Sequence, residues 1–372
     1  MRFSSRCLTI VLLTVCFLFI RLYLTGRSFA APVPPPETST EEALKAFSLL
    51  QPIDTHAHVF KNDPSFQAFL DRWHLTLLDI LVVDDKAAYA TQLEPQRTDA
   101  LTAIHISAGH MKLCTTFDPY KFANSNFAQG AIKQLNEDFA HGAVAVKLWK
   151  NVGMEIRRSD GAFIMPDDPI FEPIYKDIEE HQRTLVAHLA EPDSCWDPPS
   201  QSADYNGYYK QHPEWYMYEH PDYPSKEKLL AARDHLLEMN PRLRVVGAHL
   251  GSMETDVDRI ARHFDKYPNF AVDTAARIRY LTQQPREKVR AFLIKYQDRV
   301  LYGTDLSLPV TANVQEALKY WETTYVQDWK FFATDEIVVQ EGKRTQGLKL
   351  PEPVLRKIFR ENAIRWIPGI VK

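Results

Sequence analysis

The chain has 372 residues, of which 45% are hydrophobic and 25% are charged, with 13 glycines, 24 prolines and 4 cysteines. This globular composition excludes a collagen-like, a disulfide-framework and a wholly disordered protein, because it supplies ample apolar material for a core. The 44 Lys and Arg against 48 Asp and Glu give a formal charge of −4, which offers no basic excess for binding nucleic acid. Length alone fits one large domain or two smaller ones.

The first thirty residues differ from the rest of the chain. They carry arginines at 2, 6, 21 and 27, no acid, the apolar run 7–20 and a small-x-small end at 28–30. This pattern predicts a secretory signal over 1–30, and hence export to the periplasm or the medium. Residues 22–24 extend the apolar run, so an uncleaved membrane anchor is the alternative. The prolines that follow predict a stiff, exposed spacer over 31–39.

Cleavage would remove four arginines and no acids, leaving 40 basic and 48 acidic residues and a charge of −8. It would also leave two cysteines, Cys114 and Cys195. We expect two buried thiols, with a disulfide between them as the alternative.

A helix is predicted over 40–50, and short apolar runs then alternate with longer amphipathic segments. The runs, predicted as strands, are 52–60, 75–83, 111–117, 143–149, 184–189, 243–250, 270–274 and 300–304. The predicted helices are 126–140, 170–181, 226–239, 256–267 and 286–296. Such alternation predicts parallel strands with crossover helices, and eight repeats predict one TIM (β/α)8 barrel over 40–372. A doubly wound open sheet is the alternative, although no G-x-G-x-x-G follows the first strand.

Residues with metal-binding side chains recur near the carboxyl ends of these strands. His56 and His58 are two residues apart on the first strand, and because successive side chains of a strand point to opposite faces, these two project to the same side. His188 lies at the end of the fifth strand, His249 at the end of the sixth and Asp305 at the end of the eighth. These ends converge on one face of a parallel barrel, so the five side chains together predict a divalent-metal site. The alternative is a set of separate buried polar groups.

Lys147 lies within the apolar fourth strand, where a charged lysine is costly. It could react with carbon dioxide to form a carbamate that bridges two metal ions. Alternatively, it could pair with a carboxylate such as Glu191 or bind an anionic group of the substrate. Lys150, three residues later, is expected in solvent or at the rim.

Three further residues are predicted to contact substrate: Arg277, Glu191 and Trp196. Arg277 could bind a carboxylate with its guanidinium fork, or form a salt bridge to Asp273 or Glu191. Trp196 belongs to an aromatic-rich insertion over 191–226, which predicts a lid or wall over the site. The alternative, favoured for most of these rings, is a long loop packed against the barrel. Asp54 or Glu191 could orient a ligand imidazole.

The order of these motifs resembles the amidohydrolase superfamily. The segments DTHAHVF (54–60), AHLGS (248–252) and YGTDLSLP (302–309) look most like its amidohydrolase-related branch, which also includes decarboxylases. The ending N-A-x-R-x-x-P-G (362–369) is similar to the terminal helix of that branch, and the resemblance spans about residues 50–370.

The resemblance implies roles for individual residues. His56, His58, His188 and His249 would be metal ligands or residues of the metal site, and Asp305 would be both ligand and proton acceptor. Members with two metals usually carry a carbamylated lysine at the position of Lys147. In members with one metal, the remaining histidine often acts on the substrate.

We therefore expect an exported, divalent-metal-dependent hydrolase of a small amide, lactone or ester. The metal would be zinc, as one or two ions, with manganese or another ion as the alternative. A metal-activated water would attack the carbonyl, with Asp305 as proton acceptor and His249 as ligand or as donor to the oxyanion. A decarboxylase of a small carboxylic acid is the first alternative, and a non-catalytic metal-containing binding protein is the second. Contact with a membrane is expected only if the N-terminal segment is uncleaved, and the sequence does not predict an oligomeric state.

Overall fold

The computed structural model describes residues 38–84, 92–340 and 342–371. By its internal contacts the chain divides into two units, Met1–Thr38 and Ser39–Lys372, and the second is described below. The predicted signal over 1–30 and most of the spacer lie outside the described residues, so export stays a prediction. No helix within the described residues is both long and apolar enough to span a lipid bilayer.

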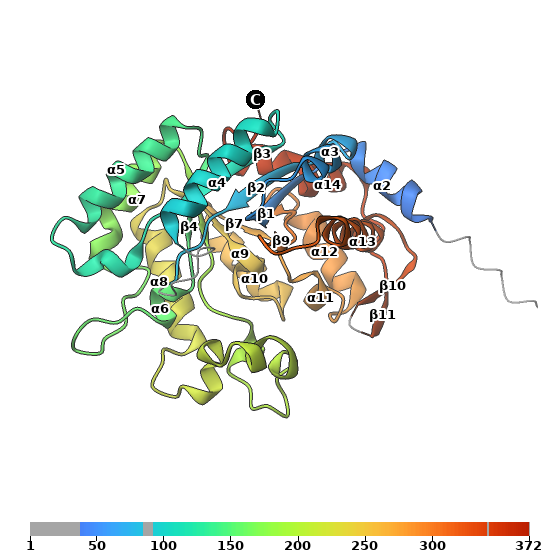
Figure 1. Cartoon of the computed structure of the whole chain (residues 1–372). Helices are drawn as coiled ribbons and strands as arrows, with labels where there is room; N and C mark the ends of the chain where they lie inside the picture. Colours follow the sequence, from blue (N-terminus) through green and yellow to red (C-terminus); the bar gives the residue numbers. More distant parts are fainter. Residues whose placement is uncertain (1–37, 85–91, 341, 372) are drawn as a thin grey trace, which may run out of the picture. The chain divides into compact units, whose positions relative to one another are not determined.

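A curled parallel sheet of nine strands forms the centre of the described chain (Figure 1). Its spatial order is β8-β7-β6-β5-β4-β3-β2-β1-β9. The strands are β1 (Ile53–Val59), β2 (Thr76–Ile80), β3 (Met111–Thr116), β4 (Ala145–Leu148), β5 (Thr184–Ala187), β6 (Arg244–Gly247), β7 (Phe270–Asp273), β8 (Val300–Leu301) and β9 (Leu306–Leu308). Every predicted strand is present, each shorter than or equal to its apolar run.

The eighth predicted strand, 300–304, is present only as β8, and β9, which follows it and was not predicted, contacts the opposite end of the sheet. β8 pairs with β7, while β9 pairs with β1. Between them, the amide of Thr55 donates to the oxygen of Tyr302 at 2.9 Å, and the amide of Asp305 donates to the oxygen of His56 at 2.7 Å. Residues 300–308 thus bring both ends of the sheet together, an arrangement consistent with a TIM-like barrel.

Helices flank the strands on both sides in Figure 1. The five predicted helices are present as α5 (Phe127–Ala140), α7 (Glu172–Glu180), α8 (Lys226–Met239), α10 (Val257–Lys266) and α12 (Arg286–Lys295). The first predicted helix is α2 (Thr40–Ser48), which begins at a capping box between Ser39 and Glu42. Elements that the apolar pattern did not predict include α3 (Pro64–Arg72), α4 (Leu93–Ile106), α13 (Val314–Ala333) and the hairpin of β10 (Ile337–Gln340) and β11 (Lys343–Gln346).

Two apolar clusters form the core. The larger lies between the helices and the sheet. The smaller takes residues from the successive strands, among them Ile53, Val186 and Val246, together with Trp366 and Ile370 at the end of the chain. The C-terminal α15 (Asn362–Trp366) is tied to the strand starts, since the hydroxyl of Thr184 donates to the oxygen of Trp366 at 2.5 Å. The opposite, carboxyl ends of the strands are thereby left for polar side chains.

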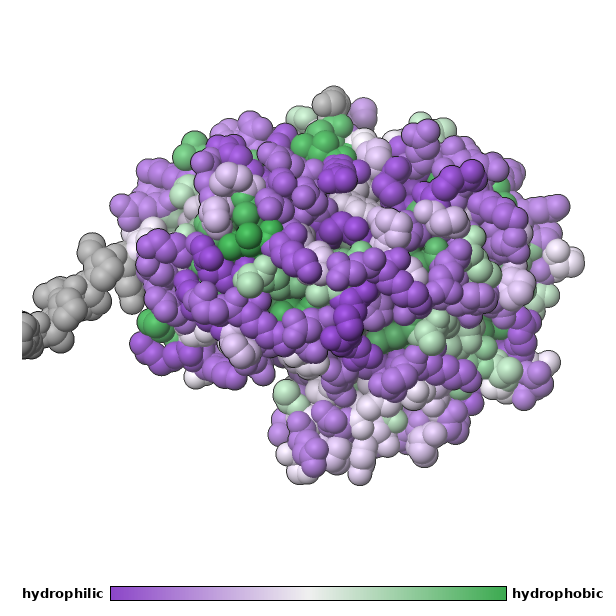
Figure 2. All heavy atoms as spheres, turned by 180° about the vertical axis from the view of Figure 1, so that it is seen from behind, coloured by the Kyte–Doolittle hydropathy of each residue, from purple (hydrophilic) through white to green (hydrophobic). Residues whose placement is uncertain are grey.

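The surface outside this core is mainly polar. Figure 2 shows one face on which hydrophilic side chains predominate and apolar patches are small. Cys114 and Cys195 are both buried and unbonded, so the expectation of two buried thiols is confirmed. A disulfide between them is excluded for this structure.

Candidate active site

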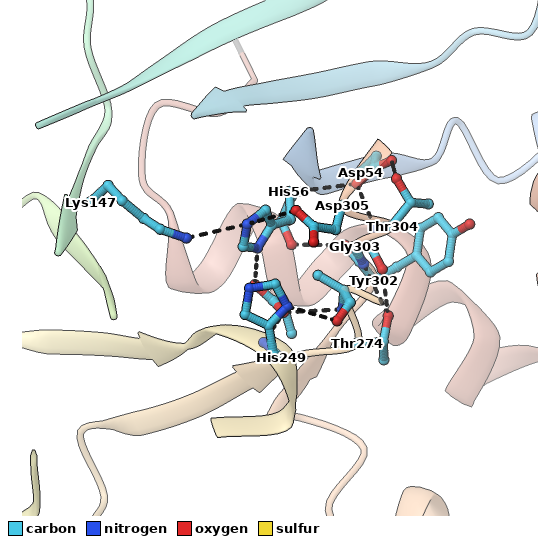
Figure 3. A network of polar contacts seen from close by, with 12 residues as sticks. Asp54, His56, Lys147, His249, Thr274, Tyr302, Gly303, Thr304 and Asp305 are labelled. Carbon is cyan, nitrogen blue, oxygen red and sulfur yellow. Dashed lines mark hydrogen bonds and ion pairs between the residues drawn. The ribbon is translucent and has the colours of Figure 1, made fainter. Parts of the chain in front are cut away.

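The carboxyl ends of β1, β5, β6 and β8 bring the five predicted metal-site residues together. Ring centroids are 5.5 Å apart for His56 and His58, 4.7 Å for His56 and His249, and 4.2 Å for His188 and His249. The Asp305 carboxylate joins the cluster, with Oδ1 at 3.2 Å from His58 Nε2 and 3.6 Å from His56 Nε2. In Figure 3, Lys147, His249 and Asp305 all approach the ring of His56.

Two of the imidazoles have their tautomer fixed by backbone carbonyls. His58 Nδ1 lies 2.7 Å from the oxygen of Ile80, and His249 Nδ1 lies 2.9 Å from the oxygen of Ala275. A carbonyl oxygen only accepts, so both Nδ1 atoms carry the hydrogen and donate it. Burial holds the pKa of His249 well below its usual value, so its ring is neutral. Its Nε2 then presents a lone pair, which suits a metal ligand and not a donor to an oxyanion.

Asp273, the last residue of β7, holds the third imidazole. Its Oδ2 lies 2.9 Å from His56 Nδ1, while its Oδ1 accepts the amide of His249 at 2.8 Å. Burial opposes ionisation of Asp273, but its contacts with His56 and His249 outweigh burial and lower its pKa. Sequence reasoning considered Asp273 only as a partner of Arg277. The signal that could have identified it is its position, since it ends a strand as the other site residues do.

His188 presents a buried ring nitrogen without a partner. Its Nε2 forms no hydrogen bond to any described residue. Burial first, and then the proximity of His249 and Lys147, hold its pKa well below the usual value. A buried polar atom without a hydrogen-bond partner is costly, so this atom fits a site that binds a ligand or an ion.

Lys147 on β4 lies beside the cluster, with Nζ 3.2 Å from His56 Nε2. Its side chain is buried, and burial lowers its pKa although Asp273 opposes this. The alternative in which Glu191 pairs with Lys147 is wrong, because Glu191 pairs with Lys150. A lowered pKa increases the fraction of free amine, which is the form that reacts with carbon dioxide, and so suits carbamate formation.

The prediction that Lys150 is solvated is wrong. Its side chain is 2% exposed, pairs with Glu191 and donates to the hydroxyl of Tyr208 at 2.9 Å. Its Nζ also lies 4.3 Å from the ring of Trp215. Burial opposes the charge, but Glu191 outweighs it and raises the pKa of Lys150. No local pattern indicates this pair, because Lys150 follows β4 and Glu191 follows β5.

The aromatic insertion serves mainly as packing. Tyr209, Trp215 and Tyr216 are buried within it, and it appears in yellow-green at the bottom of Figure 1. Tyr208 and Tyr209 also line the cavity beside the metal-site residues. Trp196, a predicted substrate contact, packs against the core instead and is not among the residues that line this cavity.

A cavity of about 350 Å³ opens beside the cluster, lined by residues that include His188, Glu191, His249, Arg277 and Asp305. A second cavity of about 610 Å³ shares Arg277 and Asp305 with it. These volumes are those of sites for small molecules.

Among the cations that line this cavity, Arg277 is the one that pairs with no described carboxylate. It is 7% exposed, its Nη1 donates to the oxygen of Ala276 at 3.2 Å, and its Nε has no partner among the described residues. The predicted alternative, a salt bridge to Asp273 or Glu191, is not formed. Lys150 is neutralised by Glu191, so the uncompensated charge at Arg277 favours an anionic group in the cavity.

Asp54 positions the backbone and does not orient an imidazole ring. Its Oδ1 accepts the amides of His56 at 3.1 Å and Thr304 at 3.0 Å, and its Oδ2 accepts the Thr304 hydroxyl at 2.6 Å. Burial raises its pKa to about 6 despite these bonds. The contacts fix the turn at Thr304 that precedes Asp305, whose φ is 67°. The imidazole-orienting role predicted for Asp54 or Glu191 belongs to Asp273.

Comparison with known proteins places the chain in a family. The family model described as amidohydrolase matches residues 53–368. The chain therefore belongs to the amidohydrolase family, as its motifs predicted. A comparison with curated proteins found no match.

Of the solved structures that are similar to the chain, two decarboxylases with TM-scores above 0.5 share its fold, and a hydrolase has a lower TM-score. A 2,6-dihydroxybenzoate decarboxylase in complex with 2,6-dihydroxybenzoate is 14% identical with a TM-score of 0.52, over 85% of this chain and 98% of that one. A dihydroxybenzoic acid decarboxylase from Polaromonas sp. JS666, with manganese and 2-nitroresorcinol, is 13% identical with a TM-score of 0.51, over 85% and 96%. A probable 2-pyrone-4,6-dicarboxylic acid hydrolase from Acinetobacter baumannii is 14% identical with a TM-score of 0.45, over 85% and 99%. At these identities the likeness concerns the fold.

Proposed function

We propose that the chain is a divalent-metal-dependent hydrolase of a small amide, lactone or ester. The observation that carries the proposal is the buried cluster in which imidazole Nε2 atoms face Asp305 while the Nδ1 atoms are engaged elsewhere. Nε2 atoms of His56 and His58 and a carboxylate oxygen of Asp305 fall within 4.8 Å of one another. Nitrogen and carboxylate donors in this arrangement suit zinc, and manganese is the alternative.

The proposed ligands are His56, His58, His188, His249 and Asp305. With two ions, a carbamate on Lys147 would be the bridging ligand. A bound divalent ion lowers the pKa of water and polarises a carbonyl group, which allows hydrolysis near neutral pH.

The chain's own residues supply proton transfer and substrate binding. Burial opposes ionisation of Asp305, but its contacts with His58, His249 and His56 outweigh burial and keep its pKa well below the usual value. An ionised Asp305 at the edge of the cavity can accept a proton from water and pass it to the leaving group. Arg277 would bind an acidic group of the substrate and hold it in the cavity.

A decarboxylase is the second candidate, favoured by the same uncompensated Arg277. A buried guanidinium at the cavity suits a substrate that is itself an acid. Two of the structures that share the fold are described as decarboxylases of dihydroxybenzoic acids, which makes aromatic acids a rational part of any substrate panel.

The proposal is tested by metal analysis of the purified chain and of three variants. His56→Ala should lose bound metal, and Asp305→Asn should lose turnover by a factor of about 10² to 10⁴. The control is His105→Ala, which removes an exposed imidazole on α4 and should change neither. A chain that binds no divalent ion, or that keeps its metal in His56→Ala, would contradict the proposal.

A panel of lactones, amides, esters and aromatic acids then separates the candidate functions. Hydrolysis without carbon dioxide release supports the hydrolase, and carbon dioxide release supports the decarboxylase. A metal-containing binding protein would bind a panel compound, convert none, and retain that affinity in Asp305→Asn.

A further inference from the structure

Two arginines lie at the end of the barrel opposite to the metal-site residues. Arg183 directly precedes β5, and Arg244 is the first residue of β6, where it is the register partner of Thr184. His188 and His249 follow the other ends of these two strands, so the arginines are separate from the candidate active site. Together with Arg242 and the end of α7, they line a cavity of about 320 Å³.

The positive charge of this cavity is only partly compensated. Arg242 pairs with Glu179, with Nη2 at 2.6 Å from Oε1. Neither Arg183 nor Arg244 forms an ion pair with any described carboxylate, and Glu180, the other acid of the lining, is exposed. The Nε atoms of Arg183 and Arg244 are both buried without a hydrogen-bond partner among the described residues. Two donors of one cavity are therefore unsatisfied.

The guanidinium groups of Arg183 and Arg244 contact neutral groups. Arg244 donates from Nη2 to the backbone oxygen of Gln182, and Arg183 lies 5.5 Å from the ring of Phe139. Burial lowers the pKa of each arginine, and no nearby carboxylate counteracts it. A guanidinium group stays charged in proteins, and two partly buried guanidinium groups that line one cavity without a carboxylate partner favour the binding of an anion there.

We propose that the cavity at Arg183 and Arg244 binds a small oxyanion of the phosphate or sulfate type. Guanidinium forks recognise such oxygens with paired, charge-assisted hydrogen bonds. The bound anion would accept from both side chains and thereby link the starts of β5 and β6. The site lies outside the proposed catalytic cluster and does not depend on the proposed function.

The test is calorimetric titration of the metal-free chain with inorganic phosphate and with sulfate. Chloride is exchanged for the titrant so that ionic strength stays constant. Wild type should show saturable binding. Arg183→Gln and Arg244→Gln should each weaken it about tenfold or more, because each removes a charge-assisted donor. The control, Arg365→Gln, removes the same charge from a side chain that is 66% exposed, and it should leave affinity unchanged.

Three outcomes would overturn the proposal. Absence of saturable phosphate and sulfate binding by the folded wild type overturns the proposal, as does binding that survives both substitutions together. A phosphoryl group could also come from a lipid headgroup. Retention on phosphatidylglycerol vesicles through the two arginines, without binding of the free anions, would overturn the proposal of a small-anion site. Circular dichroism verifies that each variant is folded, and if Arg183→Gln does not fold, Arg244→Gln decides.

Discussion

Asp328 on α13 is a buried carboxyl group that makes stability depend on pH. It is 4% exposed and accepts one hydrogen bond, from the hydroxyl of Tyr302 at 2.8 Å. Burial raises its pKa from 3.8 to about 7, against the hydrogen bond from Tyr302 and with a smaller contribution from the charge of Asp54. The folded state therefore binds this proton more tightly than the unfolded state does.

The sign and size of the effect follow from this difference. The stabilising contribution of the protonated group is fully present below the unfolded pKa, near 3.8, and is lost as pH rises through the folded pKa, near 7. A rise of this size corresponds to roughly 4 kcal/mol of unfolding free energy, an upper limit for a group that lines a cavity. Asp328→Asn carries no charge and avoids this loss, although its buried amide costs about 1–3 kcal/mol at every pH.

The assay is urea unfolding of wild type and Asp328→Asn in the presence of a chelator, from about pH 4 to about pH 8. The unfolding free energy of the variant minus that of wild type should increase with pH by up to roughly 4 kcal/mol. Asp335→Asn is the matched control, because Lys349 lowers the pKa of that exposed carboxyl group. Its difference from wild type should stay flat over this range. A difference for Asp328→Asn that is flat, or that decreases as pH rises, would refute the reasoning.

Further substitutions test the buried pair of Lys150 and Glu191, the backbone at two glycines and the candidate active site. Lys150→Met leaves Glu191 buried and unpaired, so the unfolding free energy should fall by about 3–5 kcal/mol, and adding Glu191→Leu should restore much of it. A Cβ on Gly347 would lie 2.7 Å from a backbone oxygen of α13, so Gly347→Ala should destabilise by about 1–3 kcal/mol. Gly130→Ala, with open space in α5, should stabilise by up to about 1 kcal/mol. Asp273→Asn should weaken metal affinity about 10- to 100-fold in a chelator competition, because the carboxylate holds a ligand imidazole. An unchanged free energy of unfolding, or for Asp273→Asn an unchanged metal affinity, would contradict the corresponding argument.

Most of the fold was predictable because the strands are buried on both faces. Each of these strands then reads as an apolar run, and the runs located β1 to β8 to within a few residues, although they missed β9. The carboxyl ends of the strands were less predictable. The sixth run was expected to continue to residue 250, but β6 stops at Gly247, since His249 and Leu250 adopt positive φ angles. The amide of His249 donates to Asp273, a contact from another strand that no local pattern reveals.

The break in the eighth strand has the same origin. Residues 300–304 were expected as one strand, yet β8 ends at Leu301 and the chain resumes as β9 at Leu306. Asp305 has a φ of 67°, and its amide donates to His56 on β1. The sequence predicted that Asp305 would meet the histidines, because strand ends converge. It could not predict the backbone conformation, which depends on a neighbour about 250 residues away.

The side chains around the cluster show why charge was harder to predict than position. Lys147 and Lys150 are three residues apart, and both are buried, but their environments differ. Lys150 meets the carboxylate of Glu191, which raises its pKa, whereas Lys147 meets an imidazole and has its pKa lowered. A strand pattern reports that a lysine is buried, but only the fold shows which anion reaches it. The same pairing removes Glu191 as a partner for Arg277, so the charge that the cavity offers to a substrate is decided by a contact between two other residues of its lining.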